Sequence, residues 1–315
     1  MRFTPVFRLS LALAGLMAGL LAAPVAPAQT DFSKVEIKSV KLAPGLYSLF
    51  GSGGNMALLT GADGAVLVDD QFAPLAPKIR AAIALLTDRP VRFVINTHWH
   101  FDHTGGNEAF GGNGSIIVAH ENTLKRLSTK QLIDFFNLET QPSPRAALPV
   151  ITFSDDLQLH LNGQDIEALH VKNAHTDTDV LLFFKPANVI HMGDLFTNGT
   201  YPFIDMGSGG SIEGMIASCS IVLTRSDDQT QIIPGHGPMA KRADLQSWCA
   251  MLTTVRDRIV SAIGAGQTLQ QVLAAKPTAE FDERFSKGMM NAGVWVQRVY
   301  TDLRRTITPG KRARR

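Results

Sequence analysis

The hydrophobic and polar positions between residues 35 and 70 predict a run of antiparallel strands. The stretch VEIKSVKL alternates between apolar and polar residues, and GLYSLFGSGGNMALLTGADGAVLVDD holds three short apolar runs separated by glycine-rich and Asp-Gly turns. Residues 91–96, VRFVIN, predict a buried strand. Between these segments, residues 74–88 have a helical period, and its apolar face is formed by Ile79, Ala82, Ile83 and Leu86.

The second half of the chain repeats this order of strands followed by helices. Helices are predicted over residues 122–136 and 209–226, and the proline-rich residues 138–149 are predicted to form a loop. Further strands and helices are predicted as follows: strands at 151–171, 180–186, 188–196 and 230–237, and helices at 243–266, 268–277 and 291–306. This order predicts an α/β architecture of two packed sheets with helices outside them.

The composition is that of a globular protein with a sizeable core. Of the 315 residues, 45% are hydrophobic and 18% are charged, and the formal net charge is +2. Both excess charges, Arg2 and Arg8, lie near the N-terminus, so the rest of the chain balances its basic and acidic residues. This balance predicts no nucleic-acid partner, and the terminal KRARR is predicted to be a solvated tail.

Residues 1–28 have the pattern of a secretory signal peptide. Arg2 and Arg8 precede an apolar run of about 15 residues, which is shorter than the roughly 20 that a membrane-spanning helix needs. Ala26 and Ala28 stand at the spacing of a small-x-small cleavage site. We therefore expect cleavage after Ala28, export to a periplasm and no stable membrane insertion afterwards. An uncleaved membrane anchor is the alternative.

Two cysteines, Cys219 and Cys249, are too few for a fold built on disulfides. Export permits one disulfide between them, and two separately buried thiols agree with the sequence equally well. In either case the fold must rest on its hydrophobic core.

The stretch NTHWHFDHTGGN, residues 96–107, concentrates three of the nine histidines and one aspartate within six positions. In an extended or loop backbone alternate side chains point the same way, so His98 and His100 can hold one ion. Asp102 and His103 then turn toward a neighbouring position. Imidazole nitrogens and carboxylate oxygens suit Zn²⁺ and related first-row metal ions. Because burying such groups without a ligand is costly, the cluster predicts a metal site.

Three further residues of the same kind stand at the ends of predicted strands, where binding sites are usually built. His175 lies in the polar turn AHTDTD, Asp194 ends an apolar strand, and His236 follows another strand in PGHG. The total of five histidines and two aspartates is enough for two ions with room for a bound water. The remaining histidines are predicted to be surface or core residues: His120, His160, His170 and His191.

The motifs THWHFDHTGG, AHTDTD, GD and PGHG, in this order, resemble those of the metallo-β-lactamase superfamily. The resemblance implies an αββα four-layer sandwich over residues 29–242, with the metals at one edge between the sheets. Residues 243–315 would form a C-terminal helical extension packed on the same domain. The implied cofactors are two zinc ions, or other divalent first-row metal ions. The implied ligands are His98, His100 and His175 for the first metal and Asp102, His103 and His236 for the second, with Asp194 bridging the two.

Two positions depart from the zinc β-lactamases that this family contains. Asp194 stands where those enzymes have a cysteine or a serine, and Thr197 stands where many of them have a lysine that grips the substrate carboxylate. A bridging aspartate resembles the glyoxalase II, lactonase and phosphodiesterase branches instead. Asp69, at the end of the strand AVLVD, matches a structural aspartate of the family. We expect it to accept a hydrogen bond from the second ring nitrogen of a metal-binding histidine.

The ligand set and the resemblance together predict an exported hydrolase of a small molecule. Two zinc ions would lower the pKa of a shared water toward neutrality, and the bridging hydroxide would attack the substrate while Asp102 orients it and takes up its proton. The first predicted substrate is a lactam, as for a β-lactamase, or another activated acyl compound. The alternatives are a lactonase, a thioesterase like glyoxalase II or another esterase, and then a di-metal redox protein or a binding protein.

Substrate contacts are expected around the predicted ligands. Residues 196–210 follow the bridging aspartate and are predicted to form an active-site loop, in which Asn198, Tyr201 and Ser208 are the candidate contacts. Trp99 lies between two candidate ligands and is predicted either to line the pocket mouth or to face the core. Residues 51–55, GSGGN, occupy the place of a mobile flap in relatives, and their glycines predict a flexible, open segment.

Overall fold

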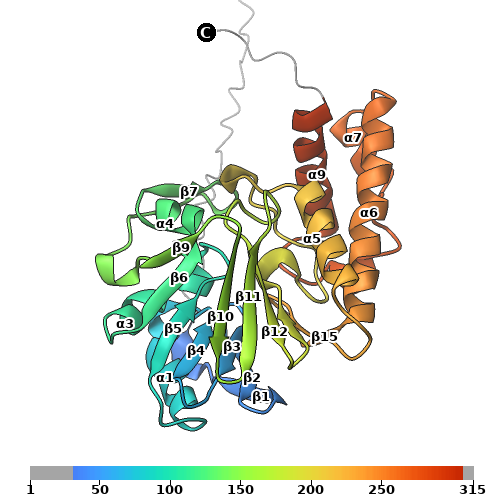
Figure 1. Cartoon of the computed structure of the whole chain (residues 1–315). Coiled ribbons are helices and arrows are strands. Elements are labelled where there is room, and N and C mark those ends of the chain that lie inside the picture. Colours follow the sequence, from blue (N-terminus) through green and yellow to red (C-terminus); the bar gives the residue numbers. More distant parts are fainter. Residues whose placement is uncertain (1–30, 308–315) are drawn as a thin grey trace, which may run out of the picture. The chain divides into compact units, whose positions relative to one another are not determined.

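Seven strands from the first half of the chain form one mixed sheet in the computed structural model, which describes residues 31–307 (Figure 1). In spatial order the strands are β1 (Lys38–Ala43), β2 (Leu46–Phe50), β3 (Met56–Leu59), β4 (Ala65–Val68), β5 (Val91–Ile95), β6 (Ile116–His120) and β9 (Ile151–Phe153). Strands β1 to β4 pair antiparallel, which confirms the predicted meander. Strands β4, β5, β6 and β9 pair parallel, so their carboxyl ends share one edge of the sheet.

The second sheet comes from the second half of the chain. In spatial order it contains β10 (Asp156–Leu161), β11 (Gln164–His170), β12 (Val180–Lys185), β13 (Val189–His191), β14 (Gln231–Ile233) and β15 (Ala240–Lys241). All neighbouring strands pair antiparallel except β13 and β14, which are parallel. The carboxyl ends of β13 and β14 therefore also lie at one edge, and the loops after them start there.

The two sheets pack face to face on a shared core. Strand β4 alternates between two environments, as a strand with two buried faces must. Its Val66 and Val68 belong to the cluster between the sheets, while Ala65 and Leu67 belong to the cluster on the outer face. That outer face is covered by α1 (Ala76–Ala84), as the helical period predicted.

Helices α5 (Ile212–Thr224) and α6 (Arg242–Gly264) pack together on the side of the second sheet, as Figure 1 shows. Helices α7 (Leu269–Ala274) and α9 (Ala292–Ile307) pack with them, and α8 (Asp282–Phe285) lies between these two in the chain. Trp248 and Trp295 are fully buried in the cluster that these helices form with the second sheet. The layers therefore run helix, sheet, sheet, helix, which confirms the predicted αββα architecture with extra C-terminal helices.

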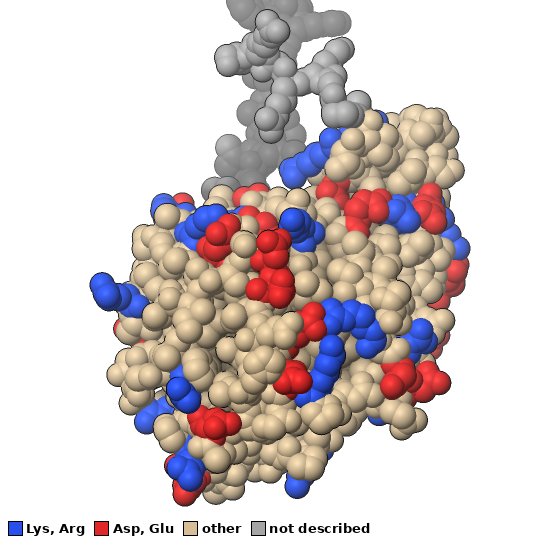
Figure 2. All heavy atoms as spheres, in the orientation of Figure 1, with Lys and Arg blue, Asp and Glu red and all other residues tan. Residues whose placement is uncertain are grey.

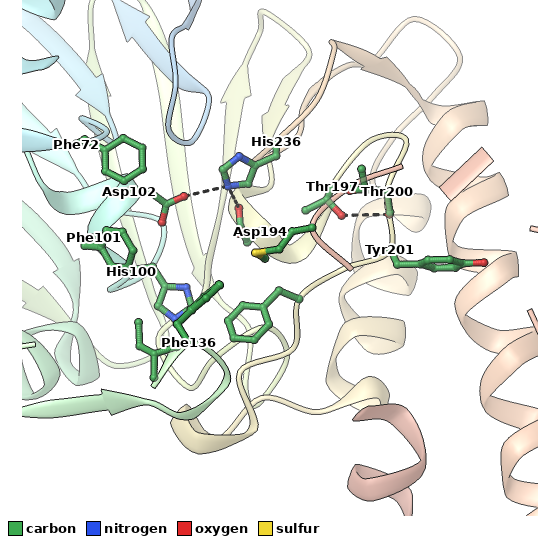
Figure 3. A pocket seen from close by; sticks show the side chains of 14 residues that line it. Phe72, His100, Phe101, Asp102, Phe136, Asp194, Thr197, Thr200, Tyr201 and His236 are labelled. Atoms are coloured by element: carbon green, nitrogen blue, oxygen red, sulfur yellow. Dashed lines mark hydrogen bonds and ion pairs between the residues drawn. The ribbon is translucent and has the colours of Figure 1, made fainter. Parts of the chain in front are cut away.

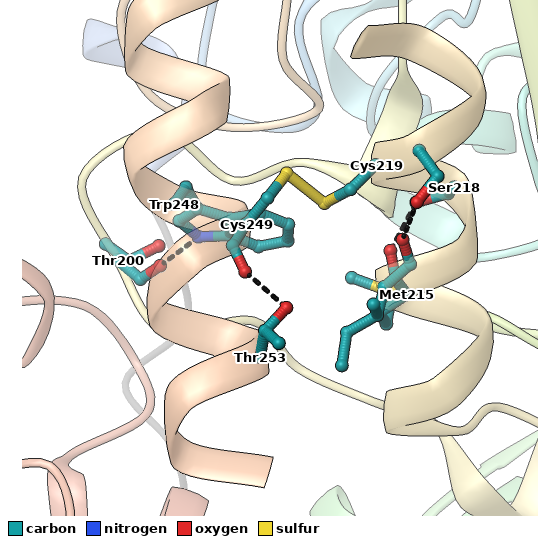
Figure 4. Close-up of a disulfide and its surroundings, with 9 residues drawn as sticks. Thr200, Met215, Ser218, Cys219, Trp248, Cys249 and Thr253 are labelled. Atoms are coloured by element: carbon teal, nitrogen blue, oxygen red, sulfur yellow. Dashed lines mark hydrogen bonds between the residues drawn. A yellow bond between two sulfur atoms is a disulfide. The ribbon is translucent and has the colours of Figure 1, made fainter. Parts of the chain in front are cut away.

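A disulfide joins the first two of these helices. Cys219 on α5 and Cys249 on α6 are bonded, with 6.0 Å between their Cα atoms (Figure 4). This settles the choice that the sequence left open. Next to the bridge, Trp248 Nε1 donates a hydrogen bond of 3.1 Å to the carbonyl oxygen of Thr200. The helical layer is thus tied to the loop that follows the second sheet's central strands.

The shorter elements correct one prediction. Helix α3 (Asn107–Gly111) follows the first predicted metal-binding loop, and α4 (Glu121–Leu127) begins where the helix 122–136 was expected, but α4 ends at Leu127. The rest of that stretch forms a hairpin of β7 (Gln131–Ile133) and β8 (Leu138–Thr140), with the 3-10 turn Asp134–Phe136 between them.

The hairpin forms because its turn and its packing outweigh the helical spacing of the apolar residues. Asn137 adopts a left-handed conformation with φ of 47°, which asparagine tolerates and which ends a helix. Ile133 is buried, and Phe135 packs against the cluster of the helical layer. The predicted loop 138–149 also contains β8 and a short 3-10 helix, Arg145–Ala147.

The predicted signal peptide, residues 1–28, lies outside the described residues. Within residues 31–307, no helix is both long enough and apolar enough to cross a membrane. Figure 2 shows basic and acidic side chains interspersed over the face in view. That face therefore carries no extended surface of one sign.

Candidate metal centre

Four of the predicted ligands follow β5, a central strand of the first sheet. His98 and His100 lie in the loop, and the short helix α2 (Phe101–Thr104) carries Asp102 and His103. His100 has an extended backbone directly before the first helical residue. The turn from extended chain into helix lets one six-residue stretch present side chains to two neighbouring positions.

The second sheet supplies the other three predicted ligands. His175 lies in the loop between β11 and β12, Asp194 lies in a 3-10 turn after β13, and His236 follows β14. All three follow the ends of strands, as the sequence indicated. Loops from both sheets therefore meet at one edge of the sandwich.

The structure brings all seven residues together. The ligand atoms within each of three overlapping groups lie within 4.8 Å of one another: His98, His100 and His175; His98, His103 and Asp194; and Asp102, His103 and His236. Asp194 belongs to both sides of the cluster, because its Oδ2 lies 3.7 Å from His175 Nε2 and its Oδ1 lies 3.2 Å from His103 Nε2. Figure 3 shows Asp194 between His236 and the rest of the pocket. The Asp194 carboxylate therefore lies within reach of candidate ligands from both sides of the cluster.

The three histidines of the first group are each held through their second ring nitrogen. His98 Nδ1 lies 3.0 Å from Thr97 Oγ1, and His175 Nδ1 lies 2.8 Å from the carbonyl oxygen of Phe203. His100 Nε2 lies 3.0 Å from Asp205 Oδ2. These contacts leave His98 Nε2, His100 Nδ1 and His175 Nε2 directed into the cluster. Outer partners of this kind fix the ring orientation of metal-binding histidines.

Asp69 performs the same task for the second group. Its Oδ2 lies 2.7 Å from His103 Nδ1, and its two oxygens accept hydrogen bonds of 2.7 Å from the backbone N–H and the hydroxyl of Thr97. The single carboxylate thus positions His103 directly and His98 through Thr97. The expected contact of Asp69 with a candidate ligand is present, and its orienting role toward a metal-binding histidine stays a prediction. Asp205, which holds His100, was not predicted.

The electrostatics of the two groups differ. Burial lowers the pKa of His98 well below its usual range and that of His175 to about 4. Burial also opposes the charge on His236, but Asp194 and Asp102 outweigh it and raise the pKa of His236 to about 10. Burial raises the pKa of Asp102, but the His103 and His236 rings outweigh it and lower that pKa to about 2. His98 and His175 therefore offer neutral imidazoles, whereas the Asp102 carboxylate of the second group is paired with the His236 imidazole.

The residues fit a divalent metal ion. His98 Nε2 is buried and has no hydrogen-bond partner within the described chain. Ring nitrogens approach each other closely, with 2.9 Å between His100 Nδ1 and His175 Nε2. Converging lone pairs and buried carboxylate oxygens are the donors that a first-row divalent cation takes up.

The segment at residues 51–55 is packed against this centre, which corrects the prediction of an open, flexible flap. Gly53, Gly54 and Asn55 are buried. The N–H of Gly54 donates a hydrogen bond of 2.9 Å to the carbonyl oxygen of Asp102. A Cβ on Gly54 would overlap the ring of His103, so only glycine allows this approach. The glycines here serve close packing on a ligand.

A cavity of about 410 Å³ opens beside the cluster. His100, Asp102, Asp194 and His236 form its polar floor, and the rest of the wall is mainly apolar. The remaining lining residues are Phe72, Phe101, Ile133, Phe136, Thr197, Thr200, Tyr201, Phe203, Gly288 and Met289. The residues that Figure 3 labels come from segments that follow strands of both sheets and from the hairpin, and Gly288 and Met289 lie between α8 and α9. A small molecule in this cavity would contact the predicted ligands directly.

Of the four predicted substrate contacts, only Tyr201 lines this cavity. Its hydroxyl is turned away, because it donates a hydrogen bond of 2.7 Å to Asp282. Asn198 donates to the carbonyl oxygen of Pro238.

The other two predicted contacts also lie elsewhere. Ser208 is buried, and its N–H donates to Asp205. Trp99 is buried in the core on the far side of the ligand loop, so of its two predicted positions the core is the one observed. Three phenylalanines that line the cavity, Phe72, Phe136 and Phe203, were not predicted as contacts, because they lie far apart in the sequence.

The other four histidines lie outside the cluster. His191 is buried, and its ring contacts backbone groups: Nδ1 accepts from the N–H of Gly193, and Nε2 lies 2.9 Å from the carbonyl oxygen of Asn55. His160 is exposed beside Asp165, and His120 stacks on His170. Their assignment to surface and core is confirmed.

The sequence of residues 49–238 matches the family model described as the metallo-beta-lactamase superfamily. The chain belongs to this superfamily. The resemblance in the motifs is thereby confirmed, and the chain is a hydrolase of this group with His and Asp side chains placed to hold a metal. The His and Asp motifs that we quoted fall within the matched residues.

Among curated proteins, the 2,4-dinitroanisole O-demethylase subunit alpha of Nocardioides sp. is 26% identical over 151 residues, which cover 46% of this chain and 42% of that protein. The match therefore spans less than half of that relative's length. Among solved structures, a metallo-beta-lactamase from Pontibacter korlensis superposes with a TM-score of 0.56 at 19% identity, over 69% of this chain and 99% of that one. The sec-alkylsulfatase Pisa1 from Pseudomonas sp. gives 0.61 at 16% identity, over 84% and 50%.

Proposed function

We propose that this chain is a dinuclear metal hydrolase, with zinc as the first candidate ion, that cleaves a small, activated acyl compound. His98, His100 and His175 would hold one ion and Asp102, His103 and His236 the other, with Asp194 shared. Two such ions supply an activated water at neutral pH and polarise the substrate oxygen. The convergence of the seven side chains at the floor of the cavity is the observation that carries this proposal.

Asp102 is the residue placed to handle a proton. Its carboxylate is 22% exposed, lines the cavity and lies 3.2 Å from His236 Nε2. A carboxylate within reach of both the ligand cluster and the cavity can orient a water for attack and accept its proton. The outer partners Asp69, Thr97 and Asp205 keep the imidazoles in place while this happens.

The cavity wall favours lactones and esters over β-lactams. No Lys or Arg of the described chain lines the cavity. Thr197 lines it, at the position where many zinc β-lactamases have a lysine that binds the substrate carboxylate. A penicillin or cephalosporin carboxylate would enter an apolar wall without a cationic partner. We therefore place a lactonase or esterase activity ahead of a β-lactamase activity, which reverses the order predicted from the sequence.

A second candidate is the cleavage of an activated aryl methyl ether. The curated relative is named as a 2,4-dinitroanisole O-demethylase subunit, and the cavity of this chain is lined by four phenylalanines. An electron-poor aromatic ether is uncharged and flat, and it suits such a wall.

The test is a substrate panel on the zinc-loaded protein with its metal content measured in parallel. We expect turnover of an acyl lactone and an aryl ester, and at least about tenfold slower opening of a chromogenic cephalosporin, the scale at which one pocket contact discriminates. Turnover of 2,4-dinitroanisole alone would favour the second candidate. A metal-loaded protein that turns over none of these compounds would refute the proposed hydrolysis.

We also propose that the protein is exported after cleavage behind Ala28. Support comes from the residue pattern of the leader and agrees with a disulfide between Cys219 and Cys249. N-terminal sequencing of the protein from a periplasmic fraction should begin at Gln29. A chain that keeps Met1 in the cytoplasm would contradict the proposal.

A further inference from the structure

We infer that the substrate carries an uncharged aromatic group, and that this group is gripped by the phenylalanine wall and by a segment of the C-terminal helical layer. The inference rests on the proposed function, because it concerns the part of the substrate that lies beside the reacting atoms. Three walls of the cavity carry it, together with the position of the nearest cations.

The first wall is the pair Phe72 and Phe101. Their ring centroids are 5.8 Å apart at an angle of 44°, and Phe101 is 39% exposed although it is a large apolar residue. Phe101 directly precedes Asp102, so this wall begins beside the candidate general base. An exposed phenylalanine ring next to polar reactive groups gains from being covered by an apolar partner.

The second wall faces the ligands from the hairpin and from the loop after η5 (Gly193–Leu195). Phe136, at 43% exposed, lies 5.5 Å from Phe203 between ring centroids. Phe203 in turn stacks on the ring of His100 at 5.9 Å and 29°. The wall therefore continues without a break from a candidate metal ligand to the cavity mouth. A flat aromatic group is the shape that stacks on such rings.

The cations near this wall are held away from the cavity. The guanidinium of Arg298 lies 5.0 Å from the Phe203 centroid and donates a hydrogen bond of 2.6 Å to the carbonyl oxygen of Ile204. Arg126 pairs with both carboxylate oxygens of Asp177. Neither arginine lines the cavity, whose only carboxylates are those of the ligand cluster. An acidic substituent on the substrate would find no partner on the aromatic wall.

The third wall comes from the C-terminal helical layer. Gly288 and Met289 line the cavity, and Met289 is 59% exposed. A Cβ on Gly288 would lie 2.5 Å from Thr200 Cγ2, so glycine permits the close approach of this segment. The N–H of Tyr201 donates 2.8 Å to the carbonyl oxygen of Phe285 and fixes the segment to the loop. This wall lies beyond residue 238, where the family match ends.

The decisive experiment measures binding of three hydroxamates that share one metal-binding head. Acetohydroxamate, phenylacetohydroxamate and 4-carboxyphenylacetohydroxamate are titrated calorimetrically into the zinc-loaded full chain. We expect the phenyl compound to bind about tenfold more tightly than acetohydroxamate, and the carboxyphenyl compound to lose that gain, since aromatic pairing and burial act only on the uncharged ring.

Variants assign the gain to the wall. Phe136→Ala should reduce the preference for the phenyl compound over acetohydroxamate to about twofold. Leu138→Ala is the matched control, because Leu138 is on the same hairpin and is 36% exposed but does not line the cavity. Met289→Ala changes an exposed residue and tests the third wall even if Phe136→Ala does not fold. It should reduce the preference about threefold.

The outcomes separate the two proposals. Equal affinity for acetohydroxamate and phenylacetohydroxamate would overturn the inference and leave the metal hydrolase intact. Tighter binding of the carboxyphenyl compound than of the phenyl compound would overturn the inference as well. Failure of all three compounds to bind, together with failure to retain zinc, would overturn the metal centre itself and the inference with it.

Discussion

Histidine rings lie against one another at two places in the described chain, and only one of these groups has the geometry of a metal site. In the cluster, the ring of His100 stands edge-on to that of His175, at 88°, and their nitrogens meet at 2.9 Å. In the other group, His120 and His170 are stacked face to face, with 3.6 Å between centroids and 13° between ring planes. Stacked rings direct their nitrogens sideways, away from each other's lone pairs.

The partners of these nitrogens explain the difference. His120 Nε2 lies 3.0 Å from the carbonyl oxygen of Ser154, and His170 Nδ1 lies 2.9 Å from that of Asp179. In the cluster, by contrast, ring nitrogens face other ring nitrogens and carboxylate oxygens. A buried histidine is therefore evidence for a metal only where ring nitrogens converge and remain unsatisfied. The pair at His120 and His170 instead joins the end of β6 to the end of β11.

Alanine substitution of one histidine in each group should change kcat/KM and metal content very differently. His175→Ala should remove one of three donors of the first ion and lower kcat/KM on the order of 10³-fold, since a metal contributes several kcal/mol of transition-state stabilisation. His170→Ala is the matched control and should leave metal content at the wild-type value. Metal analysis and steady-state kinetics on both variants provide the measurement. Equal metal loss in both would erase the distinction.

A smaller effect is expected from the outer partner of the first group. Asp205→Asn keeps the shape of the side chain that contacts His100 Nε2 but removes its charge, and metal affinity should fall about 10–100-fold. Asp165→Asn changes a close Asp–His contact outside the cluster, to the exposed His160, and should have no effect on metal affinity. Competition with a chromophoric chelator measures both. An unchanged affinity in Asp205→Asn would show that Asp205 does not position its histidine.

Asp205 also marks the limit of what the sequence could predict. The H-x-H-x-D-H spacing placed four ligands, and strand ends placed His175, Asp194 and His236. Asp69 was reachable because it ends a strand and matches the family. Asp205 contacts a histidine 105 residues earlier in the chain, and no local pattern in FIDMGS distinguishes it from an ordinary loop carboxylate.

The fold shows the same division between local and distant determinants. The alternation over β1 to β4 and the helical period of α1 are local sequence patterns, and these strands and this helix were predicted. The segment 131–140 has apolar residues spaced as in a helix, yet tertiary packing of Ile133 and Phe135 and the turn at Asn137 make it a hairpin. That hairpin carries Phe136, so the error in the element hid one wall of the cavity.

The smallest expected effect concerns pH and the stacked pair. Burial and the neighbouring His170 lower the pKa of His120 to about 4, although the Ser154 carbonyl acts in the opposite direction. The folded protein then binds fewer protons than the unfolded chain between pH 4 and 6.5. The contribution of His120 to the free energy of unfolding is thus fully present above about pH 6.5. As the pH falls toward 4, a contribution on the order of 2 kcal/mol is lost.

Two variants isolate this contribution. His120→Asn removes the titrating ring while keeping a residue that caps α4, so the fall in free energy of unfolding between pH 7 and pH 4.5 should become smaller. His160→Asn, at an exposed histidine, should leave that fall unchanged. Urea denaturation of metal-free protein at each pH gives the free energies. A steeper fall in His120→Asn would contradict the assignment.

The zinc content of the dialysed protein shows whether the seven converging side chains hold two divalent ions. We predict two zinc ions per chain for the wild type and for His170→Ala, and no more than one for His175→Ala. One ion or fewer per wild-type chain, or equal contents in all three proteins, would refute this centre.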